Sequence, residues 1–419
     1  MLFDFQKQVL ADTENFNRVA YYLDMGLGKT FVGSEKLKSF NNRINLVICQ
    51  KSKIKDWIEH LKIHCADFQI YDLTDKASFD YFISEYSPKR IGVINYELAF
   101  RRPELSKLKD ITLMLDESSM IQNDKAKRTK FTLKLKAKNV ILLSGTPVSG
   151  KYENLYSQIQ LLGWKIPKGI YYQHYIETQP REVAKGVIIN EVIGYKNVDR
   201  LKTKLKENGA VFLKAEDVNL QLPEVNEIFT EIEVTKFYKD FMKKSIIKIN
   251  DTELVGDTSL TKLLYARQLC GMFNKNKLDY FKDLIQSTND RIIVFYNFTS
   301  ELYAMEDICI ELNKPTSIIN GFEKDLKCYE EFENSITFIQ YQSGAMGLNL
   351  QKANKTIYFS LPLSSELFEQ SKARTRRIGQ EKPCFYYYLI CKNSVEEKIL
   401  TTLQMRKDYT DELFKGDFN

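Results

Sequence analysis

The chain has 419 residues, of which 43% are hydrophobic and 28% are charged, and its formal net charge is +6. This length exceeds one ordinary hydrophobic core and predicts two to three domains. No uninterrupted run reaches about 18 apolar residues, and the N-terminus has neither a signal-peptide nor a transit-peptide pattern, so we expect no membrane association. The small positive charge permits nucleic-acid binding without requiring it, since local patches decide partners.

The strongest local motif is AYYLDMGLGKT, residues 20–30, which predicts a phosphate-binding loop. Its glycines let backbone N–H groups turn toward phosphates, and the following helix adds a favourable dipole. Lys29 would reach the β- and γ-phosphates of ATP, and the Thr30 hydroxyl would bind Mg²⁺. The generic pattern has a further glycine where Leu23 stands, and the alternative is a glycine-rich turn entering a helix. The residues expected to contact the nucleotide here are Gly26, Leu27, Gly28, Lys29 and Thr30.

Short apolar runs in the first part of the chain predict buried parallel strands, joined by helical segments in a βαβ arrangement. They are residues 44–50, 91–96, 111–117 and 139–145. One helical segment carries His60 and His64 at i, i+4 spacing beside Cys65. A zinc site is conceivable there, but a fourth ligand is missing and a surface helix explains the spacing.

Two polar motifs follow the strands at 111–117 and 139–145. Asp116 and Glu117 end the first, where a Mg²⁺-holding aspartate and a water-activating glutamate belong in an ATPase; the alternative is a carboxylate-rich helix cap. Ser144, Gly145 and Thr146 end the second, and their small hydroxyl residues could sense the γ-phosphate. Alone, this second motif is only a turn.

The middle of the chain, from about 151 to 275, reads as mostly helical with aromatic residues at helical spacing, which favours core packing over base stacking. Strand-like runs return at 291–298, 335–342, 355–361 and 385–390. The sequence therefore predicts an α/β protein with two lobes and a helical insertion. We expect the first lobe at 1–165, the insertion at 166–275 and the second lobe at 276–419.

The second lobe ends in a basic motif, QSKARTRRIGQ, at residues 370–380. Arg374 and Arg377 are spaced i, i+3, which predicts a shared helix face. In a two-lobed ATPase such a face could supply arginine fingers to the γ-phosphoryl group. The alternative is a solvated basic helix. The preceding SGAMGLNL, residues 343–350, suits a loop that bends close to a nucleic-acid backbone.

These motifs, in this order, resemble the Swi/Snf family of superfamily-two helicase-like ATPases, in a minimal bacterial or phage-type version. The matching segments are LFDFQ (2–6), DMGLGKT (24–30), the Asp116–Glu117 pair, SGTP (144–147), LLYARQLCGMF (263–273), SGAMGLNL, QSKARTRRIGQ and SVEEKI (394–399). The resemblance implies two RecA-like lobes with parallel sheets and helical protrusions between them. It also implies that Gln6 contacts the adenine base.

The resemblance further implies DNA contacts in both lobes, mainly to phosphates and hence independent of base sequence. The implied positions are Lys51, Ser52, Asn95 and Tyr96 in the first lobe and Asn297, Thr299, Gln342 and Ser343 in the second. Three departures mark a divergent branch. Ser119 and Arg376 each replace a histidine of the family, the first being a residue that couples the ATP site to the motor, and Gln50 replaces a proline.

We therefore expect a DNA-dependent ATPase that uses ATP and Mg²⁺ and translocates on double-stranded DNA without separating its strands. Within enzymes, the alternative is a strand-separating helicase on branched or single-stranded nucleic acid. From another class, the alternative is a DNA-binding scaffold with an inactive ATP site. The seven cysteines are odd in number and form no CxxC pair, which favours free thiols in a reducing cytoplasm, bacterial or in a virus-infected cell. We expect a monomer.

Overall fold

The computed structural model describes residues 2–84, 89–184, 186–218, 222–249, 252–344, 348–377 and 379–414. The chain divides into two compact units, unit 1 with residues 1–220 and 407–419 and unit 2 with residues 221–406. Each unit is described by itself. Among the described residues, no helix is long and apolar enough to cross a membrane.

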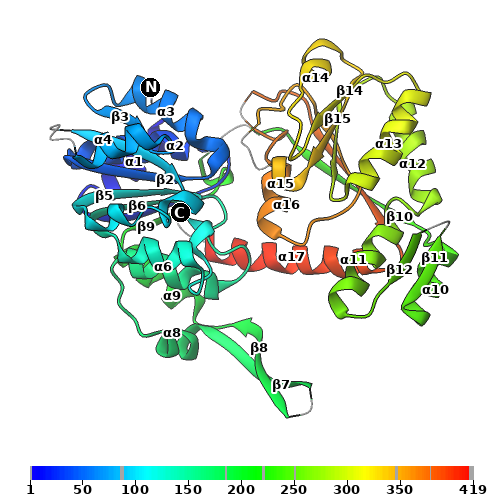
Figure 1. Ribbon diagram of the computed structural model, residues 1–419, viewed down its shortest axis with the longest axis horizontal. Helices are drawn as coiled ribbons and strands as arrows, with labels where there is room; N and C mark the ends of the chain where they lie inside the picture. Colours follow the sequence, from blue (N-terminus) through cyan, green and yellow to red (C-terminus); the bar gives the residue numbers. More distant parts are fainter. Residues whose placement is uncertain are drawn as a thin grey trace. The chain divides into compact units, whose positions relative to one another are not determined.

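Unit 1 is built on a seven-stranded parallel sheet with the order β3-β4-β2-β5-β6-β1-β9 (Figure 1). Central strands such as β5 are buried on both faces, because consecutive branched apolar side chains leave no polar face for water. The strands are β1 (Arg18–Leu23), β2 (Ile44–Cys49), β3 (Gln69–Asp72), β4 (Arg90–Asn95), β5 (Lys109–Asp116), β6 (Lys136–Ser144) and β9 (Ala210–Leu213).

Helices connect these strands and cover the sheet, as parallel connections require. They are α1 (Asp4–Asp12), α2 (Lys29–Phe40), α3 (Ile54–His64), α4 (Lys76–Ser84), α5 (Tyr96–Ala99), α6 (Lys127–Lys134), α7 (Tyr156–Leu161), α8 (Lys168–Tyr175) and α9 (Val198–Glu207). Because all seven strands run the same way, the segments that follow β1, β2, β4, β5 and β6 meet at one edge of the sheet. The candidate site of unit 1 lies there.

Unit 2 has a six-stranded parallel sheet with the order β10-β17-β16-β13-β15-β14. Its strands are β10 (Val225–Ile232), β13 (Ile292–Tyr296), β14 (Thr316–Ile319), β15 (Ile336–Gln340), β16 (Lys355–Tyr358) and β17 (Cys384–Cys391). Its helices are α10 (Lys236–Lys244), α11 (Ser259–Cys270), α12 (Lys275–Gln286), α13 (Thr299–Glu311), α14 (Lys327–Glu331), α15 (Tyr341–Gly344) and α16 (Ser365–Lys372); α17 spans Val395–Phe414. The predicted α/β class with two parallel sheets is confirmed.

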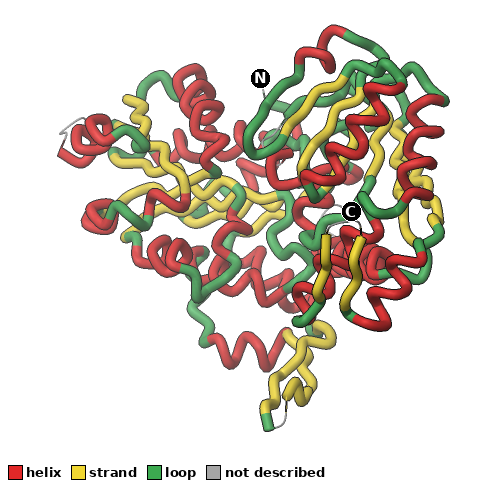
Figure 2. The backbone as a smooth tube through the Cα atoms, turned by 45° about the vertical axis from the view of Figure 1, so that its right-hand side comes forward, coloured by secondary structure: helices red, strands yellow, loops and turns green. Residues whose placement is uncertain are grey.

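The middle of the chain differs from its prediction as mostly helical. It contains β9, which belongs to the sheet of unit 1, and β10, which belongs to the sheet of unit 2. It also contains two antiparallel pairs, β7 (Ile176–Ala184) with β8 (Val187–Tyr195) and β11 (Ile246–Ile249) with β12 (Thr252–Val255). Figures 1 and 2 show β7 and β8 extending away from the sheet of unit 1. Five aliphatic side chains of β8, at 187–189, 192 and 193, are exposed, so no buried face marks this strand in the sequence. The three-part division at 165 and 275 stays a prediction.

Most aromatic residues of the middle segment pack in the core, as their spacing predicts, whereas Phe237 on α10 is 44% exposed. Tyr152, Tyr171 and Tyr175 are buried, and the phenol of Tyr171 donates to the Tyr152 carbonyl at 2.6 Å. They contact the apolar cluster that fills the sheet side of unit 1. They are therefore part of the scaffold that holds the candidate site.

Candidate functional site

The predicted phosphate-binding loop links β1 to α2. Gly26 and Gly28 have φ values of 88° and 72°, a left-handed conformation that a side chain disfavours. Leu23, where the generic motif has a glycine, is the last residue of β1 and is fully buried, so its position needs no unusual backbone. The loop therefore keeps glycine where the backbone requires it.

Lys29 begins α2 and turns its ammonium group back over the loop. Its Nζ donates to the carbonyls of Leu23 at 2.9 Å and Asp24 at 3.2 Å. A Cβ added to Gly145 would lie 3.1 Å from the same Nζ. The SGTP segment after β6 therefore lies directly beside the lysine, and a side chain at position 145 would crowd it.

The acidic pair lies at the end of β5, where Asp116 and Glu117 are half-buried. Ser144 donates its hydroxyl to Glu117 Oε1 at 2.9 Å, which joins the acidic pair to the SGTP segment. Burial raises the pKa of both Asp116 and Glu117, and the charge of Lys29 opposes that rise in each. Glu117 has a φ of 53°, a strained conformation for a residue with a side chain.

Two aromatic residues hold the acidic pair in place. The indole Nε1 of Trp57, on α3, donates to Asp116 Oδ2 at 2.7 Å. The phenol of Tyr96, at the start of α5, donates to the Asp116 carbonyl at 2.8 Å and lies 3.4 Å from the Glu117 carbonyl. Ser119, which replaces the family's histidine, has its hydroxyl 3.4 Å from Glu117 Oε1. No local pattern predicts the Trp57 contact, because 59 residues separate Trp57 from Asp116.

Gln6 also reaches the phosphate-binding loop. It is buried on α1, its Nε2 donates to the Leu27 carbonyl at 2.9 Å, and its Oε1 accepts from the Phe3 amide at 3.0 Å. A Cβ on Gly28 would lie 2.4 Å from that Nε2, so a side chain at position 28 would displace the glutamine amide. The structure brings Gln6 to the loop, and its contact with the adenine base stays a prediction.

The residues at this edge fit a nucleotide with its magnesium ion. Thr30 on α2 and Asp116 supply the oxygen ligands that Mg²⁺ prefers. The buried Thr146 hydroxyl makes no hydrogen bond with described groups, which leaves a polar atom beside the loop for a ligand. The ammonium group of Lys29 donates to two backbone carbonyls of its own loop, and a phosphate would be a stronger partner because it is charged.

The first-lobe residues predicted to contact DNA differ in exposure. Lys51 is exposed and Ser52 is half-buried, and both lie in a short 3₁₀ turn at Lys51–Lys53 just before α3. Asn95 is buried, and its amide lies 3.3 Å from Glu97 Oε2. Tyr96 is 1% exposed and its hydroxyl is committed to the backbone of the acidic pair, which leaves its side chain no surface to offer to DNA.

Unit 2 contains a pocket of about 240 Å³ that two of the predicted DNA-contact residues line. Asn297 and Gln342 lie on its wall together with Arg267, Gln340, Tyr341, Pro362, Leu363, Ser364 and Leu367. The guanidinium of Arg267 donates to the Leu361 carbonyl at 2.9 Å and stacks 5.0 Å from the Phe298 ring centre. Arg267 lies in the LLYARQLCGMF segment, whose pattern alone assigns it no role, so the sequence does not predict it as a candidate.

The other two predicted DNA contacts of the second lobe, Thr299 and Ser343, are close in sequence to residues that line this pocket, but they differ in burial. Thr299 is exposed at the start of α13, whereas Ser343 on α15 is 5% exposed. Ser343 therefore has little surface to offer. Residues 345–347 of the predicted SGAMGLNL loop lie outside the described residues.

The two predicted arginine fingers do not share a helix face, which corrects the prediction from their spacing. α16 ends at Lys372, and Arg374 and Arg377 lie in the irregular turn that follows. The phenol of Tyr386 donates to the Lys372 carbonyl at 2.7 Å and so satisfies the end of the helix. Burial lowers the pKa of Arg377, whose guanidinium donates to Asn349. Ile378 lies outside the described residues.

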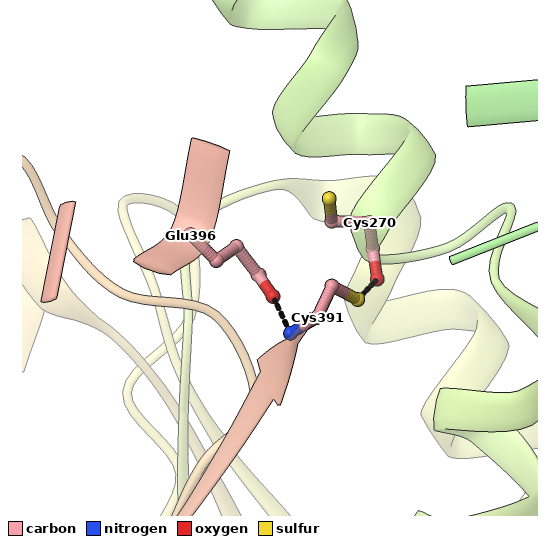
Figure 3. A group of neighbouring side chains, drawn as sticks. All are labelled: Cys270, Cys391 and Glu396. Carbon is pink, nitrogen blue, oxygen red and sulfur yellow. Dashed lines mark hydrogen bonds between the residues drawn. The ribbon is translucent and has the colours of Figure 1, made fainter. Parts of the chain in front are cut away.

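A separate group of possible metal ligands occurs in unit 2, where Cys270, Cys391 and Glu396 meet (Figure 3). Their ligand atoms lie within 4.8 Å of one another. The carboxylate is already paired with the buried ammonium of Lys277, at 2.7 and 2.9 Å, and it accepts from the Cys391 amide at 2.9 Å. The lysine supplies the positive charge that a cation would bring. The group is therefore a structural contact, which joins α11, β17 and α17 within the core. The His60–His64 pair forms no such cluster with Cys65 among the described residues.

Two protein families match segments of this chain. Residues 22–277 match the SNF2-related domain family, and residues 276–379 match the helicase conserved C-terminal domain. The chain is 24% identical to the human SWI/SNF-related matrix-associated actin-dependent regulator of chromatin subfamily A member 1, over 91% of this chain and 40% of that protein. It is 23% identical to the putative ATP-dependent helicase/translocase YwqA of Bacillus subtilis, over 94% of this chain and 46% of that protein. The chain therefore spans less than half the length of these two relatives.

A solved structure, the Sulfolobus solfataricus SWI2/SNF2 ATPase core in complex with dsDNA, aligns with a TM-score of 0.46 and 20% identity. The alignment covers 100% of this chain and 94% of that chain.

Proposed function

The chain belongs to the SNF2-related family, whose match covers more than half of its residues, and on this premise we propose that it is a DNA-dependent ATPase that translocates on duplex DNA. The observation that carries the proposal is the convergence of three segments in unit 1. Lys29 lies against Gly145, and Ser144 of the same segment donates to Glu117. A lysine, a hydroxyl sensor and a half-buried carboxylate thus surround one position, as phosphoryl transfer requires.

The proposed roles in unit 1 follow from these contacts. Glu117 polarises the attacking water, and its raised pKa brings it closer to the range where a carboxylate accepts a proton efficiently. Lys29 binds the phosphates, and Gln6 contacts the base. Ser144, Gly145 and Thr146 couple the γ-phosphate to Glu117. The backbone of the loop that binds the nucleotide comprises Gly26, Leu27, Gly28, Lys29 and Thr30.

Thr30 and Asp116 would hold Mg²⁺, which when bound neutralises charge on the phosphate oxygens. Trp57 already takes one oxygen of Asp116, so the carboxylate is oriented before any ion binds. We propose that Arg374 and Arg377 act on the transferred phosphoryl group. Their guanidinium groups would stabilise its charge in the transition state.

DNA would bind through phosphate contacts in each unit. In unit 1 we retain Lys51, Ser52 and Asn95, and we reassign Tyr96 to the support of the acidic pair. In unit 2, the pocket of Asn297 and Gln342 gains Arg267, whose positive charge suits a phosphate. Thr299 and Ser343 stay predicted contacts, the latter through its backbone.

The decisive experiment measures ATP hydrolysis by the purified chain with no polynucleotide, single-stranded DNA, duplex DNA and RNA. We expect stimulation by duplex DNA above the other three conditions. Stimulation by single strands alone would favour the second candidate, a strand-separating helicase, which release of a labelled strand would test. The absence of hydrolysis with every polynucleotide would favour the third, a DNA-binding scaffold.

A further inference from the structure

Two segments proposed to contact DNA each place an aromatic donor on the acidic pair. Trp57 follows the Lys51–Lys53 turn, in which Lys51 is exposed, by one helical turn, and Tyr96 directly follows Asn95. The indole holds the Asp116 carboxylate, whereas the phenol holds the Asp116 carbonyl. Side chain and backbone of one residue are thus held from two different directions.

From this arrangement, and resting on the proposed function, we propose that Trp57 and Tyr96 are positioning residues that transmit DNA binding to Asp116. Neither side chain is exposed, since Trp57 is 2% and Tyr96 is 1% accessible, so neither touches DNA itself. Trp57 is preceded by the exposed Lys55 and Asp56, and Tyr96 lies between the buried Asn95 and the exposed Glu97. The two hydrogen bonds therefore link these segments to the acidic pair.

The Trp57 route is mechanically direct. Lys53 closes the 3₁₀ turn by donating its amide to the Gln50 carbonyl at 2.9 Å, and its ammonium pairs with Asp56 of α3 at 2.8 Å. A phosphate bound at Lys51 or Ser52 would pull on this turn and on the first turn of α3 with it. Because hydrogen bonds weaken steeply with distance and angle, a small displacement of Trp57 changes how the Asp116 carboxylate is held.

Ser119 also contacts the acidic pair, and its hydroxyl lies 3.4 Å from Glu117 Oε1. The hydrogen bond from Trp57 to the Asp116 carboxylate is 2.7 Å long and charge-assisted, so it is the stronger of these two links.

The test compares Trp57→Phe with Trp164→Phe, the same change at the chain's other tryptophan. Trp164 packs against Tyr171 and Tyr175 in unit 1, away from the acidic pair. We expect Trp57→Phe to reduce duplex-stimulated ATP hydrolysis about tenfold, the cost of one hydrogen bond to a charged group. Duplex affinity should stay within about twofold, and the Mg²⁺ concentration for half-maximal rate should rise, whereas Trp164→Phe keeps wild-type stimulation.

A second measurement does not depend on the Trp57 variant folding. In Trp164→Phe, Trp57 is the only tryptophan, so its fluorescence reports on the indole hydrogen bond when duplex DNA is added without nucleotide. We expect the emission to shift, and Lys51→Ala to reduce that shift. Tyr96→Phe, which removes only a hydroxyl from a buried ring, should lower DNA stimulation in the same direction.

The outcomes separate this inference from the proposed function. If wild-type protein is stimulated by duplex DNA and Trp57→Phe is stimulated equally, the inference is overturned while the proposed function stands. Unchanged Trp57 emission at saturating duplex DNA overturns it as well. If no polynucleotide stimulates the wild-type protein, the proposed function itself fails.

Discussion

The two units carry their candidate residues in different ways. In unit 1, Lys29, Asp116 and Glu117 follow buried parallel strands and are held by hydrogen bonds within the unit. In unit 2, Arg374 and Arg377 lie in an irregular turn after α16 has ended. The groups proposed to bind nucleotide are thus fixed by regular structure, whereas those proposed to complete catalysis are not.

This difference indicates a division of labour. A preorganised site binds its ligand at little entropic cost, so unit 1 has what nucleotide binding needs. A turn with fewer backbone constraints can change conformation, which suits residues that act only in the transition state. If this interpretation is correct, variants in unit 2 should lower turnover and leave nucleotide affinity unchanged.

The largest expected effect tests that separation with Arg374→Ala and Arg377→Ala. Removing an arginine finger should lower the rate of ATP hydrolysis about 10³-fold or more, because charge on the transferred phosphoryl group loses its partner. Affinity for a fluorescent ATP analogue should remain close to wild type. Arg376→Ala is the matched control, since Arg376 donates to the Pro223 carbonyl at 3.2 Å and should affect turnover only slightly. The proposed division of labour would be contradicted if Arg377→Ala lost affinity for the nucleotide but still hydrolysed ATP at the wild-type rate.

The second prediction concerns the general base in unit 1. Glu117→Gln keeps the shape and the hydrogen bond from Ser144 but cannot accept the proton, so the duplex-stimulated rate should fall about 10²–10⁴-fold. Nucleotide binding should persist, which steady-state hydrolysis and analogue titration together would establish. Asp124→Asn, at an ion pair with Lys168 on the surface of unit 1, serves as the control. Hydrolysis by Glu117→Gln at the wild-type rate would remove this residue from the mechanism.

The same contrast explains what the sequence could predict. Buried strands have a short, continuous apolar pattern, so the runs at 44–50, 111–117 and 139–145 located β2, β5 and β6 and the polar groups at their ends. Local motifs also placed Lys29 beside a glycine-rich turn. These features depend on residues that are neighbours in the sequence, so the sequence alone predicts much of the arrangement of the unit 1 site.

Features that depend on tertiary contacts were not predicted. The i, i+3 spacing of Arg374 and Arg377 is compatible with a helix, but the buried Thr375 and the Tyr386 hydroxyl end α16 first. The exposed aliphatic residues of β8 leave no buried face to reveal a strand. Likewise, the burial of Tyr96 follows from the packing of α5 against the sheet, and no local pattern reports it.

A smaller effect is expected at the pocket of unit 2. Arg267→Ala should weaken duplex binding about tenfold and reduce the slope of log affinity against log salt by about one, as loss of one phosphate contact requires. Fluorescence anisotropy at several salt concentrations measures both. Lys239→Ala, an exposed charge on α10 of the same unit, should change neither. An unchanged salt slope in Arg267→Ala would show that the pocket does not receive a phosphate.

The smallest expected effect concerns stability: the partly buried carboxyl group of Glu117 in unit 1 should lower the free energy of unfolding at neutral pH. Burial raises the pKa of Glu117 above its ordinary 4.5, so in the folded state this carboxyl binds a proton at pH values where the unfolded chain has lost it. Stability therefore falls as pH rises from about 4.5 through the raised pKa, and the loss is complete above that value.

Glu117→Gln removes this titration and the buried charge together. At pH 8 the variant should melt about 2–4 °C higher than wild type, the shift expected for about 1 kcal/mol in a domain of this size. As the pH is lowered toward 4.5, wild-type Glu117 takes up its proton and the difference should shrink. Thermal melting at several pH values measures it, and Asp124→Asn, at a half-buried carboxylate paired with Lys168, is the control. A melting-temperature difference that stays constant with pH would mean that Glu117 has the same pKa in the folded and the unfolded chain. Burial would then not raise its pKa.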